Sequence, residues 1–506
     1  MAAGHSRCQP ALRCCVVPTI DLRSPRDGSE RALAELLLVP ALAVELGERF
    51  AASGYRLHLV GGSVRDMLLR RHAETPDLDF TTDAHPPQVQ QVVGGWAQES
   101  WEVGIDFGTV GFARGGVRCE VTTYRSERYE PLSRNPRVSF GETLEGDLLR
   151  RDFTVNAMAV SVPGLLFVDP HGGLRDLLAG VLRTPAPAVE SFGDDPLRMM
   201  RAARFAATLG VRPTQEVLHA MTQLGDRLSI VAPERLREEL IKTVLAPDPV
   251  SGLELLVDTG LAEHVLPELP ALKLSIDEHA QHKDVYAHTL RVLEQAIQLE
   301  SRLPGGGPNL VLRLAALLHD IGKPATKKVM SPGKVSFHKH ELVGARMTRT
   351  RLKALRFPKE TVGAVAELVA LHLRFHGYGE AAWTDSAVRR YVTDAGTQLE
   401  LLHLLTRSDC TTRNQRKAAR LTAAYDALEQ RIARLAEQED LRALRPELDG
   451  TAIMAVLGIP PGPLVGQAYA HLLEIRLERG LIGPGAAQDE LRSWAADHGL
   501  LVPPAG

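Results

Sequence analysis

The stretch that decides the fold runs from Leu59 to Thr81 and reads LVGGSVRDMLLRRHAETPDLDFT. An apolar strand ends here, the chain turns at Gly61 and Gly62, and a predicted helix follows. Glycines at a strand-to-helix turn let backbone N–H groups approach a phosphate closely, and a helix N-terminus favours negative charge. Arg65, in the first turn of the helix, can add a bidentate phosphate contact. This half of the stretch therefore indicates a phosphate-binding turn, and an ordinary tight turn fits it equally well.

The other half places two carboxylates side by side on a predicted strand. Asp77 and Asp79 are two residues apart and share one face, while Leu78 and Phe80 face the core. Neighbouring carboxylates repel each other unless a cation lies between them, and Mg²⁺ bridging to triphosphate oxygens would fit. A solvated strand face is the alternative for the pair alone. Because both halves occur within one βαβ-sized unit, together they indicate a nucleoside triphosphate and a metal.

Length and composition limit the possible classes of protein. A chain of 506 residues predicts several domains, and its net charge of −3 means that any RNA-binding surface is a local basic patch. The five cysteines show neither zinc-site spacing nor a disulfide framework. No apolar run approaches the roughly 20 residues that a membrane helix needs, and the N-terminus does not resemble a signal peptide. We expect a soluble, cytoplasmic protein that does not bind membranes.

The pattern along the chain predicts an α/β domain followed by helical domains. Short β-rich runs alternate with turns up to about residue 180, and helical periodicity dominates beyond Pro185. The predicted parts are a disordered leader (residues 1–30), an α/β head (31–185), a helical neck (186–250), a helical domain (251–410) and a helical C-terminal part (411–506). At the start of the last part, residues 410–435 are basic and predict a helix face that suits either solvent or an RNA backbone.

Three features of the α/β domain have two interpretations each. Glu120 lies on a predicted strand, where it can be a third metal carboxylate or part of a solvated face. Arg150, Arg151 and Asp152 suit phosphate binding as well as surface ion pairs. The segment 126–147, which is rich in charges and contains Pro131 and Pro136, predicts a mobile loop beside the site.

The neck begins with a predicted helix that carries three regularly spaced arginines. Asp195 lies near its N-terminus, and the helix is expected to stop at Gly210. Arg198, Arg201 and Arg204 recur every third residue, so the stripe they form winds around the helix along a groove. An amphipathic helix over residues 234–245 is expected to pack beside it.

The region after residue 251 is predicted to be all helical and contains many histidines. An adjacent His and Asp at the end of an apolar helix, with another His upstream and an Asp downstream, is metal-ligand chemistry of the imidazole-plus-carboxylate kind. A set of hydrogen-bonded or surface histidines is the alternative. The residues concerned are His279, His282, His288, His319, Asp320, His338, His340, His372, His376 and Asp409.

Several of these motifs occur in an order that resembles a known family. LVGGSVRD, DLDF, RRDFTVNAMA, DDPLRMMRAARF, ERLREEL and the H…HD…D series are similar to those of class II CCA-adding tRNA nucleotidyltransferases, in the poly(A) polymerase family. The long HD-type helical domain resembles the actinobacterial form, and the resemblance covers about residues 40–500. It implies a nucleotidyltransferase head, a neck, an HD-type body and a tRNA-binding tail. It also implies that C, C and A are added to the tRNA 3′ end from CTP and ATP without a nucleic-acid template.

The resemblance also implies roles for individual residues. Asp77 and Asp79 would hold catalytic Mg²⁺, and the nucleotide would contact Gly62, Arg65, Arg151, Arg201 and Arg204. The family's base-reading motif falls on residues 194–198, so the bases would face Asp195 and Arg198. Asp194 stands where many members have Glu, which shortens a supporting side chain.

The chemistry of the bases agrees with a carboxylate–guanidinium reading pair. Cytosine and adenine both present an amine donor beside a ring-nitrogen acceptor, which an Asp and an Arg can match. Uracil and guanine present the reverse order, and an opposed hydrogen bond in a buried site costs several kcal/mol. The resulting hypothesis is an in-line attack by the tRNA 3′-hydroxyl on the α-phosphate, releasing pyrophosphate.

Three alternatives share some of these motifs. A bacterial poly(A) polymerase has the same head and neck motifs, and a partial enzyme would add only CC or only A. A third interpretation gives the main role to His288, His319, Asp320 and Asp409, as the metal ligands of an HD-type phosphohydrolase. Oligomeric state and the way in which addition stops after three nucleotides stay open.

Overall fold

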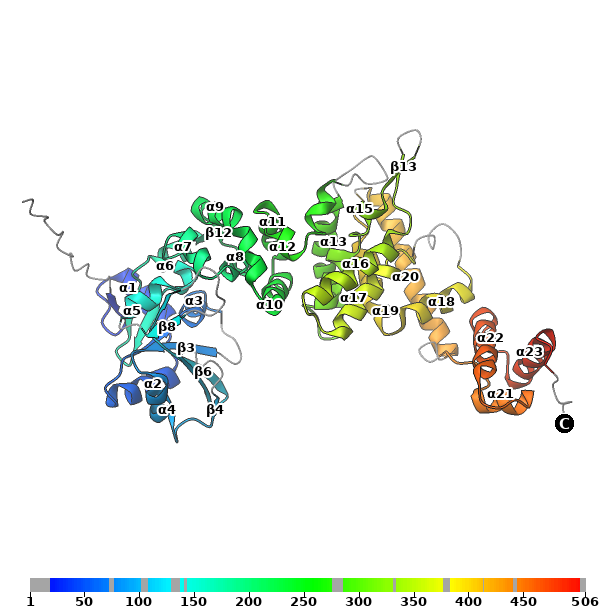
Figure 1. Ribbon diagram of the computed structural model, residues 1–506, viewed down its shortest axis with the longest axis horizontal. Helices are drawn as coiled ribbons and strands as arrows, with labels where there is room; N and C mark the ends of the chain where they lie inside the picture. The colour runs from blue at the N-terminus through cyan, green and yellow to red at the C-terminus, as the bar shows by residue number, and fades with distance from the viewer. Residues whose placement is uncertain are drawn as a thin grey trace, which may run out of the picture. The chain divides into compact units, whose positions relative to one another are not determined.

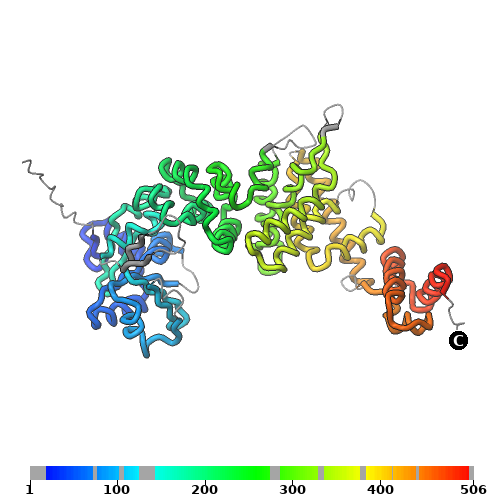
Figure 2. The backbone as a smooth tube through the Cα atoms, viewed as in Figure 1, coloured from blue at the N-terminus to red at the C-terminus, as the bar shows by residue number. Residues whose placement is uncertain are grey.

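The computed structural model describes residues 19–71, 77–101, 108–128, 137–140, 143–274, 285–330, 334–375, 383–412, 414–439 and 444–500. The chain divides into two compact units, Met1–His264 and Val265–Gly506, which Figure 2 follows from blue to red. The first unit combines a sheet with helices and the second is nearly all helical, which confirms the predicted fold class. In the described parts of the chain, no helix has both the length and the apolar character needed to cross a membrane.

The first unit is built on a mixed eight-stranded sheet (Figure 1). β3 pairs in parallel with β6, and all other neighbours in this sheet are antiparallel. In spatial order the strands are β1 (Thr19–Asp21), β10 (Leu166–Val168), β9 (Ala159–Val162), β2 (Leu57–Val60), β3 (Asp77–Thr82), β6 (Val117–Thr123), β5 (Thr109–Arg114) and β4 (Glu99–Trp101).

The pairing of β2 with β3 brings the two halves of the deciding stretch together. The stretch has the size of a βαβ unit, but β2 and β3 are antiparallel, with Leu59 opposite Phe80. The start of β3 therefore lies beside the end of β2, where the glycine turn begins. Leu78 and Phe80 are buried, as the alternation of β3 predicts, so the carboxylates of Asp77 and Asp79 share the opposite face.

Helices of the head cover and connect these strands. α2 packs on β2 and β9, and a Cβ at Gly47 would meet the backbone of Val162 at 2.5 Å, which explains a glycine inside this helix. The head helices are α1 (Gly28–Leu36), α2 (Ala41–Ala52), α3 (Gly62–Leu68), α4 (Pro86–Val93), α5 (Leu144–Leu149) and α6 (Gly173–Ala179).

Two segments of the first unit differ from the sequence prediction. Residues 19–30, expected in a leader, include β1, which pairs with β10, and the start of α1, which Asp27 caps by accepting hydrogen bonds from the N–H groups of Ser29 and Glu30. The expected loop at 126–147 contains β7 (Arg125–Arg128), β8 (Arg137–Phe140) and most of α5. β1 takes its partner from far along the chain, whereas β7 and β8 pair with each other within the expected loop, and neither pairing follows from local sequence signals.

The neck helices complete the first unit. α8 begins after Pro196, ends at Gly210 in the left-handed conformation (φ +70°), and buries Met199 and Ala203 against α10 and α11. Both predicted neck helices are therefore present. The elements of the neck are β11 (Val181–Leu182), α7 (Ala188–Asp194), α8 (Leu197–Leu209), β12 (Arg212–Pro213), α9 (Gln215–Leu224), α10 (Pro233–Val244), α11 (Pro249–Asp258) and α12 (Ala262–Val265).

Over its described residues, the second unit is helical apart from one short hairpin. Val329 pairs with Val335 across β13 and β14, where an all-helical segment is expected from the sequence. Its elements are α13 (Val285–Leu299), α14 (Leu310–Leu318), α15 (Lys323–Thr326), β13 (Lys328–Met330), β14 (Lys334–Ser336), α16 (His340–Ala354), α17 (Lys359–Leu371), α18 (Asp385–Ala395), α19 (Leu399–Ser408), α20 (Gln415–Gln438), α21 (Gly450–Leu457), α22 (Pro463–Arg479) and α23 (Pro484–Asp497).

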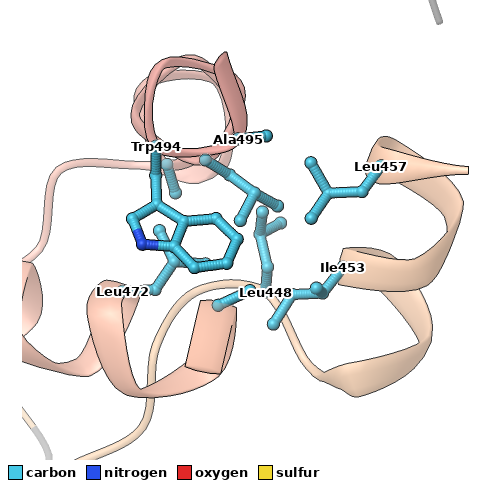
Figure 3. Packing of buried hydrophobic residues seen from close by; sticks show 9 residues of the cluster. Leu448, Ile453, Leu457, Leu472, Trp494 and Ala495 are labelled. Atoms are coloured by element: carbon cyan, nitrogen blue, oxygen red, sulfur yellow. The ribbon is translucent and has the colours of Figure 1, made fainter. Parts of the chain in front are cut away.

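The last three helices share an apolar cluster of their own. Figure 3 shows Trp494, Leu472 and Leu457 converging from α23, α22 and α21. Leu448 and Ile453 complete the contact, and all five side chains are buried. Burial of one such side chain is worth about 1.5–3 kcal/mol, so this cluster holds the three helices together.

Candidate active site and metal centre

The glycine turn is fastened directly to the strand that carries the carboxylates. Gly61 has φ +71°, a conformation that favours glycine, and α3 starts at Gly62. The hydroxyl of Ser63 donates a hydrogen bond to the carbonyl of Asp77 and accepts one from the N–H of Asp79, both at 3.1 Å. The turn and the two carboxylates are thus held in a fixed register.

The carboxylate face of β3 is reinforced by its parallel neighbour. Glu120 of β6 lies in register with Asp79, so the two side chains share a face. Burial is the main reason that the pKa of Asp79 is raised to about 6, and the negative charges of Glu120 and Asp77 act in the same direction. The guanidinium groups of Arg151 and Arg201 oppose the rise. Oxygen donors crowded in this way fit a hard divalent cation, which would offset their repulsion.

The arginine of the glycine turn is linked to the neck through buried polar side chains. Arg65 donates to Asn156 Oδ1 at 2.5 Å, and Asn156 donates to Asp152 Oδ1 at 2.9 Å. Asp152 Oδ2 lies 2.8 Å from Arg201 of α8. Asp152 and Asn156 are only 6% and 5% exposed, so this chain fixes α8 against the head. Sequence reasoning did not single out Asn156, although a polar residue in the apolar run VNAMAV was a signal.

Arg151 lies against the glycine turn from the other side. A Cβ added to Gly61 would come within 2.8 Å of Arg151 Nη1. Asp147 of α5 accepts a hydrogen bond from Arg151 Nη2 at 3.2 Å, and this contact holds the guanidinium in place. Four predicted site residues, Asp77, Asp79, Arg151 and Arg201, are therefore brought close enough for their charges to interact.

The predicted base-reading pair lies at the first turn of α8, where both side chains have other partners. Arg198 is 9% exposed and donates to Ser191 Oγ at 2.7 Å and to the carbonyl of Arg150 at 2.6 Å. Asp195, which precedes the N-cap residue Pro196, accepts a hydrogen bond from the N–H of Leu197.

The last arginine of the stripe has a partner on α10. Arg204 forms an ion pair with Glu239 of α10 at 3.1 Å. Burial lowers the pKa of Arg204 below its usual value. The structure therefore places Arg204 at the packing of α8 on α10.

Six side chains of the second unit form a separate site, here called the histidine cluster. They come from α13, the C-terminal ends of α14, α17 and α19, and the start of α16. His288 Nε2 lies 3.0 Å from Asp409 Oδ1, and His319 Nε2 lies 3.2 Å from Asp320 Oδ2. The members are His288, His319, Asp320, His340, His372 and Asp409.

The imidazoles of the cluster are oriented by the main chain. His319, His340 and His372 each contact, through Nδ1, the carbonyl oxygen three residues earlier, at 2.8, 2.9 and 2.7 Å. A carbonyl accepts only, so Nδ1 carries the proton and Nε2 presents a lone pair to the centre. This arrangement is typical of histidines that ligate a metal.

The other predicted histidines have different places. His338 is exposed, two residues from the buried His340. His279, His282 and His376 lie outside the described residues. Sequence reasoning included His340 and His372 in the wider set of candidate ligands but assigned the hydrolase metal to His288, His319, Asp320 and Asp409, because helical spacing alone did not bring His340 and His372 to the same point.

Comparison with known proteins identifies the family to which the chain belongs. The family model for the poly A polymerase head domain matches residues 57–183, that for the probable RNA- and SrmB-binding site of polymerase A matches 210–272, and that for the HD domain matches 285–437. The A-adding tRNA nucleotidyltransferase of Deinococcus radiodurans is 34% identical over 447 residues, 87% of this chain and 95% of the relative. The chain belongs to the tRNA nucleotidyltransferase and poly(A) polymerase family.

Further members of this family differ in what their names say they add. The CC-adding tRNA nucleotidyltransferase of Thermus thermophilus is 33% identical over 446 residues, 86% of this chain and 92% of the relative. The crystal structure of the Bacillus stearothermophilus CCA-adding enzyme in complex with CTP superposes with a TM-score of 0.64 at 24% identity, covering 90% of this chain and 98% of that one. That likeness shows that the tRNA nucleotidyltransferase fold is shared.

Proposed function

We propose that this nucleotidyltransferase adds C, C and A to the 3′ end of tRNA, using CTP and ATP and releasing pyrophosphate. The observation that carries the proposal is the fastening of a glycine turn to two strand carboxylates, with Arg151 and Arg201 beside them. The names of the relatives indicate tRNA as the acceptor of the nucleotides, because they describe enzymes that add A, CC or CCA.

The carboxylates of the head would hold the metal. Asp77 and Asp79, with Glu120 in register, present the all-oxygen donor set that Mg²⁺ takes. When bound, Mg²⁺ would supply Lewis-acid stabilisation of charge on the triphosphate. The raised pKa of Asp79 supports this assignment, because a cation would favour its ionised form.

The residues around the carboxylates would position the triphosphate. Backbone N–H groups at Gly62 would approach it closely, and Arg65 and Arg151 would offset its negative charge. The tRNA 3′-hydroxyl would then attack the α-phosphate in line with the departing pyrophosphate. Because Asn156 and Asp152 link Arg65 to Arg201, the neck helix would be held at a fixed distance from the triphosphate.

Base choice would depend on Asp195 and Arg198. Asp195 would accept from the exocyclic amine of cytosine or adenine, and Arg198 would donate to the ring nitrogen. Arg198 now donates to Ser191 and to the carbonyl of Arg150, so reading a base would require it to exchange at least one of these partners. The reading pair would thus be assembled by the incoming nucleotide.

An extension assay tests the proposed function. Three tRNA transcripts, ending before CCA, after C and after CC, are incubated with CTP alone, ATP alone or both, and the products are resolved to one nucleotide. The proposal requires two C additions from CTP, one A addition to the CC-ended transcript, and no further growth. A long A tail would indicate a poly(A) polymerase, and extension that stops at CC or starts only from CC would indicate a partial enzyme.

The histidine cluster favours a second function, phosphate-ester hydrolysis assisted by metal in the HD domain. Its support is the set of imidazoles that gather around Asp320 in two groups of potential ligand atoms. Phosphate release from a model ester should survive Asp79→Ala and be lost in His319→Ala. Loss in the first variant and retention in the second would assign hydrolysis to the head instead.

A further inference from the structure

We infer that Trp101 forms a stacking platform for the last base of the RNA acceptor, whose 3′ end would enter the head across β6, β5 and β4. The inference rests on the proposed function and adds a subsite for the acceptor. Its support is a row of residues that runs across the open face of the sheet from the carboxylates to this tryptophan.

Strand register places Trp101 on the same face of the sheet as the carboxylates. Glu120 of β6 lies between Asp79 of β3 and Gly111 of β5. Gly111 in turn lies opposite Trp101 of β4. Residues that lie opposite one another in neighbouring strands point to the same face, and neighbouring strands are about 4.7–4.9 Å apart. The indole therefore belongs to the carboxylate face and lies beyond Glu120 as seen from Asp79.

The indole reaches back over the sheet toward Glu120. A Cβ added to Gly111 would collide with the pyrrole ring of Trp101, so the absence of a side chain at Gly111 is what lets the ring lie there. Phe112, on the opposite face of β5, is fully buried, whereas Trp101 is only half-buried. The sheet thus supports the tryptophan ring on one side and leaves part of it accessible to a ligand.

A guanidinium group lies beside this ring. The Cζ atom of Arg118 is 5.4 Å from the centre of the Trp101 ring. Arg118 is exposed and lies opposite Asp77 in register, so it also belongs to the carboxylate face. Proteins that bind single-stranded nucleic acid combine aromatic rings, on which bases stack, with cations that follow the phosphate backbone. Trp101 and Arg118 present both groups together.

The position of the platform indicates which nucleotide it would bind. Arg151 lies against Gly61 of the glycine turn, and β2, which leads into this turn, borders β3 on the side away from β6. The attacking hydroxyl and the departing pyrophosphate of an in-line displacement lie on opposite sides of the α-phosphate. With the pyrophosphate toward the glycine turn, the hydroxyl would come from the side of β6, and the base of its nucleotide would reach Trp101.

Stacking suits an acceptor whose last base changes during the reaction. Before each of the three proposed additions the acceptor ends in a different nucleotide or in a newly added C. A tryptophan contacts the π-face that every base has, and it does not read the hydrogen-bonding edge of the base. The incoming base, which has to be chosen, would instead be read by Asp195 and Arg198.

The rival explanation is that Trp101 only covers the backbone of Gly111. Any apolar side chain of sufficient size could then replace it, whereas a stacking platform requires an aromatic ring. Trp101→Leu keeps an apolar cover and removes the π-face, and Trp101→Phe keeps both. The two variants therefore separate stacking from covering.

Steady-state extension of a tRNA transcript that ends before CCA measures the KM for the transcript and the KM for CTP. Trp101→Leu should raise the KM for the transcript about tenfold, as expected for the loss of one base stack, and leave the KM for CTP unchanged. Trp101→Phe should stay close to wild type. Tyr55→Ala, which removes a half-buried aromatic residue before the start of β2, should change neither constant.

A transcript whose last nucleotide lacks its base provides the decisive comparison. Wild type and Trp101→Leu should use it with the same KM, because no base is left to stack. A difference that persists with this transcript, or equal KM values for the intact transcript, would overturn the inference. Failure of the wild-type protein to extend tRNA would instead overturn the proposed function, so the two failures are distinguishable.

A binding measurement on the wild-type protein does not depend on the variants. With 2-aminopurine as the last base of the transcript, stacking on the indole should lower the fluorescence when the protein binds in the absence of CTP. Unchanged fluorescence at saturating protein would overturn the inference even if Trp101→Leu fails to fold.

Discussion

At the scale of single residues, burial displaces the pKa values of two groups of the head in opposite directions. It raises the pKa of Asp79, which also lies beside other carboxylates, and it lowers the pKa of His58, whose Nδ1 lies 3.0 Å from the hydroxyl of Tyr124. The raised pKa of Asp79 bears on the proposed chemistry, and the lowered pKa of His58 bears on the stability of the fold. Each can be tested by one substitution.

Asp79→Asn should lower kcat for C addition by about a thousandfold, since it removes a charged oxygen from the proposed metal site, a loss of several kcal/mol of transition-state stabilisation. Single-turnover extension of tRNA with CTP measures the effect. Asp83→Asn is the matched control, because Asp83 also lies beside β3 but pairs with Arg56. Equal losses in both variants would contradict the metal role.

His58 should make the first unit less stable below neutral pH. Burial lowers its pKa to about 4 from 6.5, so between these values the unfolded chain binds a proton that the folded chain does not. The free energy of unfolding should therefore fall as the pH drops through this window, by about 3 kcal/mol in total.

Urea denaturation at several pH values measures this dependence. His58→Gln keeps an acceptor for Tyr124 and should flatten the curve, whereas His219→Gln, at an exposed position on α9, should leave it unchanged. An identical pH dependence in wild type and His58→Gln would exclude the assignment.

At the scale of elements, the sequence predicted correctly those features that nearby residues determine. The glycine turn, the alternation of β3 and the end of α8 at Gly210 follow from nearby residues, and the structure confirms them. The strand at residues 19–21 depends on a partner far along the chain, β10, whereas β7 and β8 pair with each other inside the segment that was expected to be a loop. Register also places Glu120 beside Asp79, and its side chain is exposed, as the solvated-face interpretation of the sequence expects.

Gly61→Ala should weaken nucleotide binding, because a methyl group would strain the backbone at φ +71° and displace the guanidinium of Arg151. We expect the KM for CTP to rise by about tenfold, the loss of one charge-assisted contact. Steady-state extension measures it. Gly54→Ala is the control, with φ +84° and nothing within 4 Å of the added Cβ. An unchanged KM in Gly61→Ala would remove Arg151 from the triphosphate site.

At the scale of the whole molecule, the chain carries two candidate metal-ligand sets of different chemical character, one in each unit. The head offers only carboxylate oxygens, which suit Mg²⁺, whereas the histidine cluster is rich in imidazole, which suits transition metals. Because each unit has a core of its own, ligands of one site should stabilise mainly the unit that contains it.

Metal removal should therefore loosen the second unit selectively. Ions bound at about 100 times their Kd stabilise a folded unit by about 2.7 kcal/mol, and chelation withdraws that amount. Hydrogen exchange followed by mass spectrometry should show faster exchange in α14 and α17 after EDTA treatment, with β3 unchanged. Faster exchange in β3 alone would place the structural metal in the head.

The apolar cluster of α21, α22 and α23 is built only from residues after Glu447. Substitutions among these residues, such as Leu472 or Trp494, can therefore accumulate together without compensating changes in the sheet or in the histidine cluster. Natural selection can in this way reshape the last helices, which the sequence predicts to bind tRNA, while the residues of the carboxylate site remain as they are.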